Sequence, residues 1–198
     1  AITYSSAESK LAAEILYSYL EKSLPNTFEI KDKNITKSDA QIILEIQKNN
    51  KELKDQEFIL KSNSQDISLL ATNLKSLKYA VYTLLEKWEF RKFTATVSYI
   101  PKPDAFIFPK NFYQKYQPTF AYRTLLYPDS YDQAFREWHK LDWFNDDFGL
   151  WGHTFDRLVP PKTHFKTNPK LYALYEGKRR AESLCMTNDT VVDYSVVN

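Results

Sequence analysis

Glycine is scarce in this chain: Gly149, Gly152 and Gly177 are the only three among 198 residues. A loop that cradles phosphate, or a dinucleotide-binding turn, needs several glycines where a strand passes into a helix. The three glycines do not lie in such a pattern. Their placement therefore excludes nucleotide chemistry of these two kinds from the part of the protein that the sequence covers.

Cysteine and histidine are also rare. Cys185 is the only cysteine, so the chain can form no internal disulfide and is not expected to hold a thiolate metal cluster. The three histidines, His139, His153 and His164, are too widely spaced for the local pattern of a helical zinc motif. We therefore predict neither a metal site nor a cofactor.

Long apolar runs and an excess of one charge are missing as well. No stretch approaches the ~18 apolar residues of a membrane span, and Ala1 is not followed by the pattern of a signal peptide. The protein is therefore expected either to be cytosolic or to have lost its signal peptide. Basic and acidic residues number 27 and 25, which gives a net charge of +2 and does not favour nucleic acid or anionic lipid as a partner.

The residues that are present predict a packed α+β domain at the start of the chain. Hydrophobic residues make up 43% of the sequence and aromatic residues 16%, as in globular proteins. A helix is expected over residues 6–22, with a capping box from Ser5 to Glu8 and an end before Pro25. A second helix is expected over residues 73–88, with Asn73 as its N-cap.

Three short apolar runs predict strands between these helices: residues 41–47 (QIILEIQ), 57–62 (EFILKS) and 66–72 (DISLLAT). The polar turns between them favour an antiparallel meander. One face of the first strand is wholly apolar, and the two helices are expected to cover it. Prolines punctuate residues 101–118, so we expect the domain to span residues 1–110.

The rest of the chain, residues 111–198, is predicted to be the first strand-helix units of an incomplete (β/α) barrel. Residues 120–126 (FAYRTLL) and 148–155 (FGLWGHTF) are expected to be strands, and residues 130–139 have helical spacing. A closed barrel needs eight such units and about 250 residues. We therefore expect a truncated barrel that could self-associate through its open strand edge.

Barrel active sites lie at the carboxyl ends of the strands. Arg123, with Tyr122 beside it, and His153, with Trp151 beside it, therefore become candidate contacts for a sugar. Two alternatives remain open. Arg123 could instead form a structural ion pair with one of two nearby aspartates, Asp129 and Asp132, and Trp151 could be a core residue.

Four aspartates lie near the second predicted strand, and glycoside hydrolysis commonly needs a pair of carboxyl groups. The four are Asp142, Asp146, Asp147 and Asp156. Spacing along a loop does not establish such a pair, and the sequence favours a solvated loop as the explanation of the adjacent Asp146 and Asp147. A long insertion is expected over residues 162–188, where Tyr172, Tyr175, Lys178 and Arg179 could line a pocket, followed by a helix capped by Asn188.

Two stretches resemble known families. Residues 76–102, with the core YAVYTLLEKW and a downstream YIPK, resemble part of the small N-terminal domain of glycoside hydrolase families 20 and 67. Residues 138–188, especially WGHTFDRLVPP, HFKTNPKLYALYEGKR and SLCMTN, are similar to the bacterial group called domain of unknown function 4838. That group has a hexosaminidase-like N-terminal domain followed by a barrel.

The resemblance implies roles for two positions. Arg123 would lie where hexosaminidase-type barrels hold a sugar-gripping arginine, and the loop after His153 would border the substrate cleft. Residues 75–78 (KSLK) depart from the family, whose members usually have a glycine before the helix. The strand that bears the acid pair is absent from this sequence, so the resemblance assigns no catalytic residue.

The expected protein is therefore the N-terminal portion of a secreted bacterial glycoside hydrolase-like protein that acts on complex glycans. Its expected location is the periplasm, the cell surface or the medium. The alternatives are a non-catalytic carbohydrate-binding or scaffold protein with a degenerate barrel, and a small self-contained interaction domain.

Overall fold

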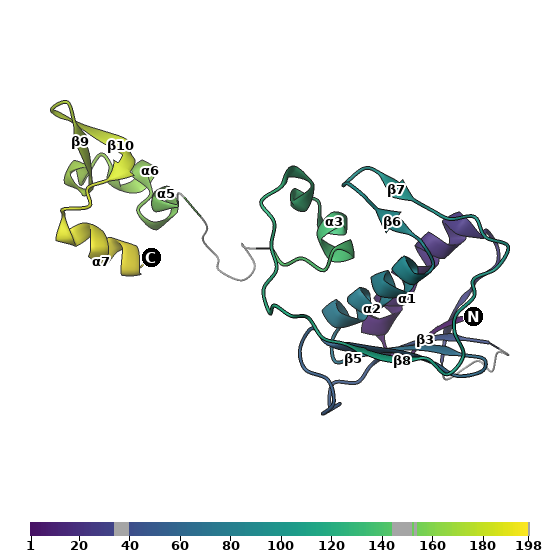
Figure 1. Ribbon diagram of the computed structural model, residues 1–198. Helices are drawn as coiled ribbons and strands as arrows, with labels where there is room; N and C mark the ends of the chain where they lie inside the picture. The colour runs from purple at the N-terminus through teal and green to yellow at the C-terminus, as the bar shows by residue number, and fades with distance from the viewer. Residues whose placement is uncertain (34–39, 144–151, 153, 198) are drawn as a thin grey trace. The chain divides into compact units, whose positions relative to one another are not determined.

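The computed structural model describes residues 1–33, 40–143, 152 and 154–197 (Figure 1). Within it the chain forms two compact units, Ala1–Asp142 and Trp143–Asn198. The domain end expected at residue 110 falls inside the first unit. Each unit has its own buried apolar cluster, so each is considered by itself.

Helix α1, Ala7–Ser23, begins one residue later than expected and with a different cap. Ser6 is the N-cap: its side chain accepts a hydrogen bond from the backbone N–H of Ser9, and the Ser9 hydroxyl accepts one from the backbone N–H of Ser6. The capping box predicted for Ser5 and Glu8 is therefore wrong. Ser9, at the third helical position, accepts the hydrogen bond from the N-cap N–H that a glutamate usually accepts.

Helix α2, Leu74–Lys87, follows the prediction closely. The Asn73 side chain accepts a hydrogen bond from the Ser76 backbone N–H, as an N-cap should. Leu77, Leu84 and Leu85 are fully buried, because their spacing places them on one side of the helix.

The sheet of the first unit has six strands in the order β2-β1-β3-β5-β4-β8. The strand bounds are Ile2–Tyr4 for β1, Ile30–Asp32 for β2, Ile42–Ile46 for β3, Phe58–Ser62 for β4, Ile67–Ala71 for β5 and Tyr113–Tyr116 for β8. All three predicted strands are present, but the meander is wrong. Strands β4 and β5 pair antiparallel, whereas β3 pairs in parallel with β5 and with β1.

Helices α1 and α2 cover one face of this sheet, as Figure 1 shows. Ile42 and Leu44 of β3 point into the core, with exposed fractions of 7% and 0%. Leu77 and Leu84 of α2 meet them with none of their surface exposed. The expected burial of these four residues is confirmed, and the first unit is a mixed α+β domain.

The segment after α2 contains three strands that were not predicted from the sequence, because its prolines indicated irregular structure. Strands β6, Arg91–Lys92, and β7, Ser98–Tyr99, form a short hairpin, and β8 pairs antiparallel with β4 at the edge of the main sheet. Strand β8 lies between Pro109 and Pro118 rather than on either of them. Proline is tolerated beside an edge strand, so the segment adds a strand instead of a linker.

Residues 120–126 form no strand, contrary to the prediction. Their backbone groups bond to loops and side chains rather than to neighbouring strands: the Asp142 N–H donates to the Arg123 carbonyl at 2.6 Å, and the Gln56 side chain donates to the Ala121 carbonyl at 2.7 Å. A 3-10 helix η1, Pro128–Tyr131, and helix α3, Gln133–Trp138, follow. The barrel is not confirmed, and self-association through its edge stays a prediction.

The second unit is built around a hairpin. Its elements are α5 (Phe155–Leu158), α6 (Pro161–His164), η2 (Pro169–Leu171), β9 (Tyr172–Tyr175), β10 (Lys178–Leu184) and α7 (Asp189–Val197). Strands β9 and β10 turn through Glu176 and Gly177, whose φ angles are 50° and 74°, and Gly177 adopts this left-handed conformation without steric cost. The Asn188 side chain accepts from the Thr190 N–H, as expected of a cap.

Most of the strand predicted over residues 148–155 lies outside the described residues, and Phe155 begins helix α5 instead. No helix in the described ranges is both long and apolar enough to cross a bilayer.

Candidate functional site

The guanidinium of Arg123 is held by three neutral oxygens of the first unit. Nε donates to the Lys140 carbonyl at 2.9 Å, and Nη1 donates to the Phe120 carbonyl at 2.6 Å. Nη2 donates to the side-chain oxygen of Gln56 at 2.7 Å. A guanidinium has five N–H donors, so these bonds leave one N–H on each terminal nitrogen.

Asp142 fixes the backbone of Arg123 rather than its side chain. The buried carboxylate of Asp142 accepts a hydrogen bond from the Arg123 backbone N–H at 2.8 Å and an ion pair from Lys75 at 2.6 Å. The ion pair of Arg123 with Asp129 or Asp132, the alternative raised from the sequence, does not form: Asp129 accepts from the Ala95 N–H, and Asp132 caps α3. The side-chain charge of Arg123 thus has no ion-pair partner among the described residues.

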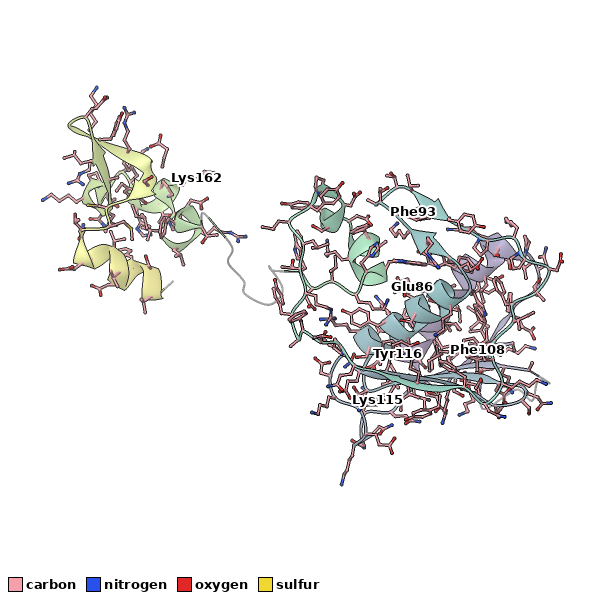
Figure 2. The ribbon with its side chains drawn as sticks, in the orientation of Figure 1. Glu86, Phe93, Phe108, Lys115, Tyr116 and Lys162 are labelled. Carbon is pink, nitrogen blue, oxygen red and sulfur yellow. The ribbon has the colours of Figure 1, made fainter. Side chains whose placement is uncertain are left out.

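Arg123 lines an open pocket of about 230 Å³. The other lining residues come from the loop before β4, from β4, α2, β8 and the end of α3; they are Gln56, Phe58, Tyr79, Tyr116, Gln117, Pro118, His139 and Lys140. Tyr116, labelled in Figure 2, stacks on Phe58 with ring centroids 4.7 Å apart. The pocket therefore combines aromatic surface with amide and cationic groups.

Tyr79 forms the aromatic surface beneath the guanidinium. The Arg123 Cζ atom lies 5.8 Å from the centre of its ring, within the range of a cation–π contact. Tyr79 is 3% exposed, and its burial raises the pKa of its hydroxyl although the positive charges of Lys75 and Arg123 act in the opposite direction. The ring therefore stays neutral and provides a flat apolar face.

Two residues that hold Arg123 have left-handed backbone conformations. The φ angle is 63° at Gln56 and 58° at Lys140. Side chains other than glycine rarely adopt this region, and such residues persist where the surrounding structure fixes them, often at functional sites. The hydrogen bonds that Arg123 donates to Gln56 and Lys140 therefore depend on these left-handed turns.

Ion pairs hold the segment around the pocket against α2. Lys78 pairs with Glu137 at 2.8 Å, and Lys140 pairs with Glu86, labelled in Figure 2, at 3.1 Å. Burial tends to raise the pKa of Glu137, but hydrogen bonds from Lys78 and Gln133 outweigh burial and hold this pKa below its ordinary value. Glu137 is therefore a structural anion.

Of the four residues predicted to contact a sugar, the structure describes two. Arg123 lines the pocket, and Tyr122 is half-buried beside it. His153 and Trp151 lie outside the described residues, so the predicted rim that joins them to Arg123 stays a prediction. Gln56 and Lys140, the partners of Arg123, could not be predicted from the sequence, because nothing in their local sequence indicates a left-handed turn.

The pocket has hydrogen-bonding groups for a ligand, but it has no carboxylate for acid catalysis. None of its lining residues is aspartate or glutamate, and Asp142 is buried and already bonded. Asp146 and Asp147 lie outside the described residues. In the second unit, Asp156 and Glu182 line an open hollow of about 400 Å³, but both are exposed, and a general acid usually needs enclosure.

The residues predicted for the wall of an insertion loop have structural roles or lie in the open. Tyr172 is buried and donates its hydroxyl hydrogen to the Val159 carbonyl at 3.0 Å, and Arg179 bonds the carbonyl of Tyr172. Tyr175 and Lys178 lie exposed on the hairpin. The described residues include no cluster of three histidine, cysteine or acidic side chains that could hold a metal ion.

Comparison with known proteins gives one family and two distant structural likenesses. The family described as a domain of unknown function, DUF4838, matches residues 92–198, more than half of the chain. No curated protein sequence matches.

Two solved structures are similar to part of the chain. One is a GH138 enzyme targeting pectin rhamnogalacturonan II, with 11% identity and a TM-score of 0.35; the match covers 45% of this chain and 10% of the enzyme. The other is an inactive mutant of a GH20 exo-β-N-acetylglucosaminidase from Vibrio harveyi, with 20% identity and a TM-score of 0.34; this match covers 49% of this chain and 14% of the other. Both likenesses are too slight to argue from, and the chain spans only a small part of either structure.

Proposed function

The chain belongs to the DUF4838 family, and from this premise we propose that it is the N-terminal portion of a secreted glycoside hydrolase-like protein and that it contacts glycans. The pocket beside Arg123 is the observation that carries the proposal. Carbohydrates are bound by planar hydrogen-bonding side chains together with aromatic faces, which cover the apolar side of a sugar ring. Arg123, Gln56 and Gln117 provide the first kind of group, and Tyr79 and Tyr116 provide the second.

The resemblance of residues 76–102 to the small domain of hexosaminidase-type hydrolases supports the same proposal, because those domains precede a sugar-binding barrel. The finer features remain part of the proposal: secretion to the periplasm or cell surface, and His153 and Trp151 as further contacts.

The second candidate function is carbohydrate binding without catalysis. The observation that favours it is the absence of carboxylates from the lining of the pocket. Hydrolysis commonly needs one protonated and one ionised carboxyl group placed on either side of the glycosidic bond. A pocket without either group binds a sugar but does not cleave it.

Titration calorimetry with soluble polysaccharides tests the proposal. Arg123→Ala should weaken glycan binding by about 1.5–3 kcal/mol, the usual loss for hydrogen bonds from a charged group. Reducing-end assays on the 198-residue chain should detect no hydrolysis. Measurable hydrolysis would reject the binding-only candidate, whereas glycan affinity unchanged by the substitution would remove Arg123 from the site.

A further inference from the structure

The lining of the Arg123 pocket contains basic side chains and no acidic one. Arg123, His139 and Lys140 line it, and its remaining surface is aromatic, amide or proline. The charge of Lys140 is offset by its ion pair with Glu86 at 3.1 Å, and the His139 Nε2 atom donates to the Lys92 carbonyl at 2.9 Å. Arg123 is therefore the group whose charge the surrounding side chains leave uncompensated.

The contacts of Arg123 explain why its charge is available. Its three hydrogen bonds go to two carbonyls and an amide oxygen, and the nearby carboxylate of Asp142 is already engaged with Lys75 and with a backbone N–H. One N–H remains on each terminal nitrogen. A carboxylate that accepts from both of these donors forms the paired hydrogen bonds by which arginine binds anions most strongly.

The pocket is small, which limits the ligand. Its volume of about 230 Å³ is below the roughly 300–1,000 Å³ typical of sites for drug-sized ligands. It has room for a single ring or a ring substituent rather than for an oligosaccharide. The stacked rings of Phe58 and Tyr116 supply the flat wall that such a ring needs.

We propose that this pocket selects a sugar that carries a carboxylate over neutral sugars. The proposal rests on the proposed glycan contact and narrows it to an acidic residue of the glycan. The carboxylate binds the two remaining N–H groups of Arg123, and the ring packs against Tyr116. A sulfated sugar presents a related anion, and the experiment separates the two.

The test is a protein-observed NMR titration of the 198-residue chain at low ionic strength, read at the Arg123 Nε–H and the Gln56 side-chain amide. The probes are glucuronate, glucose, glucose 6-sulfate and sodium sulfate. Glucuronate should bind at least tenfold more tightly than glucose, and more tightly than either sulfate compound. Added salt should weaken its binding, because the attraction is electrostatic.

Gln117→Glu is the main variant. Gln117 is exposed and lines the pocket, so the substitution keeps the size of the side chain and adds a negative charge without disturbing the core. It should abolish the preference for glucuronate over glucose, because only glucuronate carries a charge that the new carboxylate repels. Arg180→Gln in the second unit is the matched control, since Arg180 also lies over a tyrosine ring, at 5.9 Å from the centre of Tyr175.

The outcomes separate this inference from the proposed function. Equal affinity for glucuronate and glucose overturns the inference and leaves the glycan contact standing. Equal affinity for glucuronate and sodium sulfate also overturns it, because the site then binds a simple ion. If none of the sugars shifts either signal, both the inference and the pocket as a glycan contact are rejected.

Discussion

The sheet domain and the segment that follows it, residues 118–142, belong to one compact unit but are held together in different ways. The sheet and its two helices share an apolar core in which Leu44, Leu60 and Leu77 have none of their surface exposed. The later segment places Trp138 in the same core, and polar contacts also hold it, among them the bonds of Arg123 and the ion pairs of Asp142 and Glu137. Burial of apolar surface builds the scaffold, and directed polar contacts shape the pocket.

The largest effect is expected from a substitution in the apolar core of the sheet domain. Leu44→Ala should lower the free energy of unfolding by about 2–5 kcal/mol, because a fully buried leucine leaves a cavity. Urea denaturation followed by circular dichroism measures the loss. Leu11→Ala is the matched control on α1: Leu11 is 49% exposed, so a change beyond about 0.5 kcal/mol would contradict the assigned packing.

A smaller effect is expected in the polar half. Asp142→Asn should cost about 1–3 kcal/mol, because the buried group loses its ion pair with Lys75 and its bond from the Arg123 N–H weakens. Hydrogen exchange should become faster at Arg123 while the amides of β3–β5 keep their protection. Equal acceleration in both places would show that the two regions are not held separately.

The N-cap of α2 is a polar contact that belongs to the sheet domain, so it tests both halves of the comparison. Asn73→Ala should cost about 1 kcal/mol through the lost bond to the Ser76 N–H. Urea denaturation of this variant and of Asn73→Ser, which keeps a capping oxygen, makes the comparison. Equal losses in the two variants would argue against a capping role.

The smallest effect is a dependence on pH. The pKa of Glu137 is lower in the folded protein than its ordinary value, so its stabilising contribution is present above the unfolded pKa of about 4.3 and is lost as pH falls through the folded pKa. Glu137→Gln should reduce the loss of stability with acid below that pH. Lys78→Met should act in the same direction, by no more than about 1 kcal/mol, because the pair is partly exposed.

The same contrast explains what could be predicted from the sequence. Periodic apolar residues fix α2, and the burial of Ile42 and Leu44 follows from alternation along β3. Strand order does not follow from such patterns, because residues 41–47 have the same alternation whether they pair in parallel or antiparallel. Strand β1 has only three residues, too few for a pattern.

The pocket was accessible to prediction only at Arg123. Gln56 and Arg123 are far apart in the chain. Their contact depends on a left-handed turn at Gln56, which a glutamine in the sequence does not predict. Lys75 and Lys78, which depart from the expected family pattern, gain an explanation only in the fold, where they pair with Asp142 and Glu137.

Trp138 decides where the first unit can be cut. Its side chain is 2% exposed and packs between Tyr19 of α1 and Tyr82 of α2, with ring centroids 5.4 and 5.3 Å away. A fragment ending at residue 110 would lack this tryptophan and the edge strand β8, leaving both tyrosines facing water. Expression of the isolated domain should therefore extend to residue 142, and a shorter fragment would be a poor reference for every measurement on the pocket.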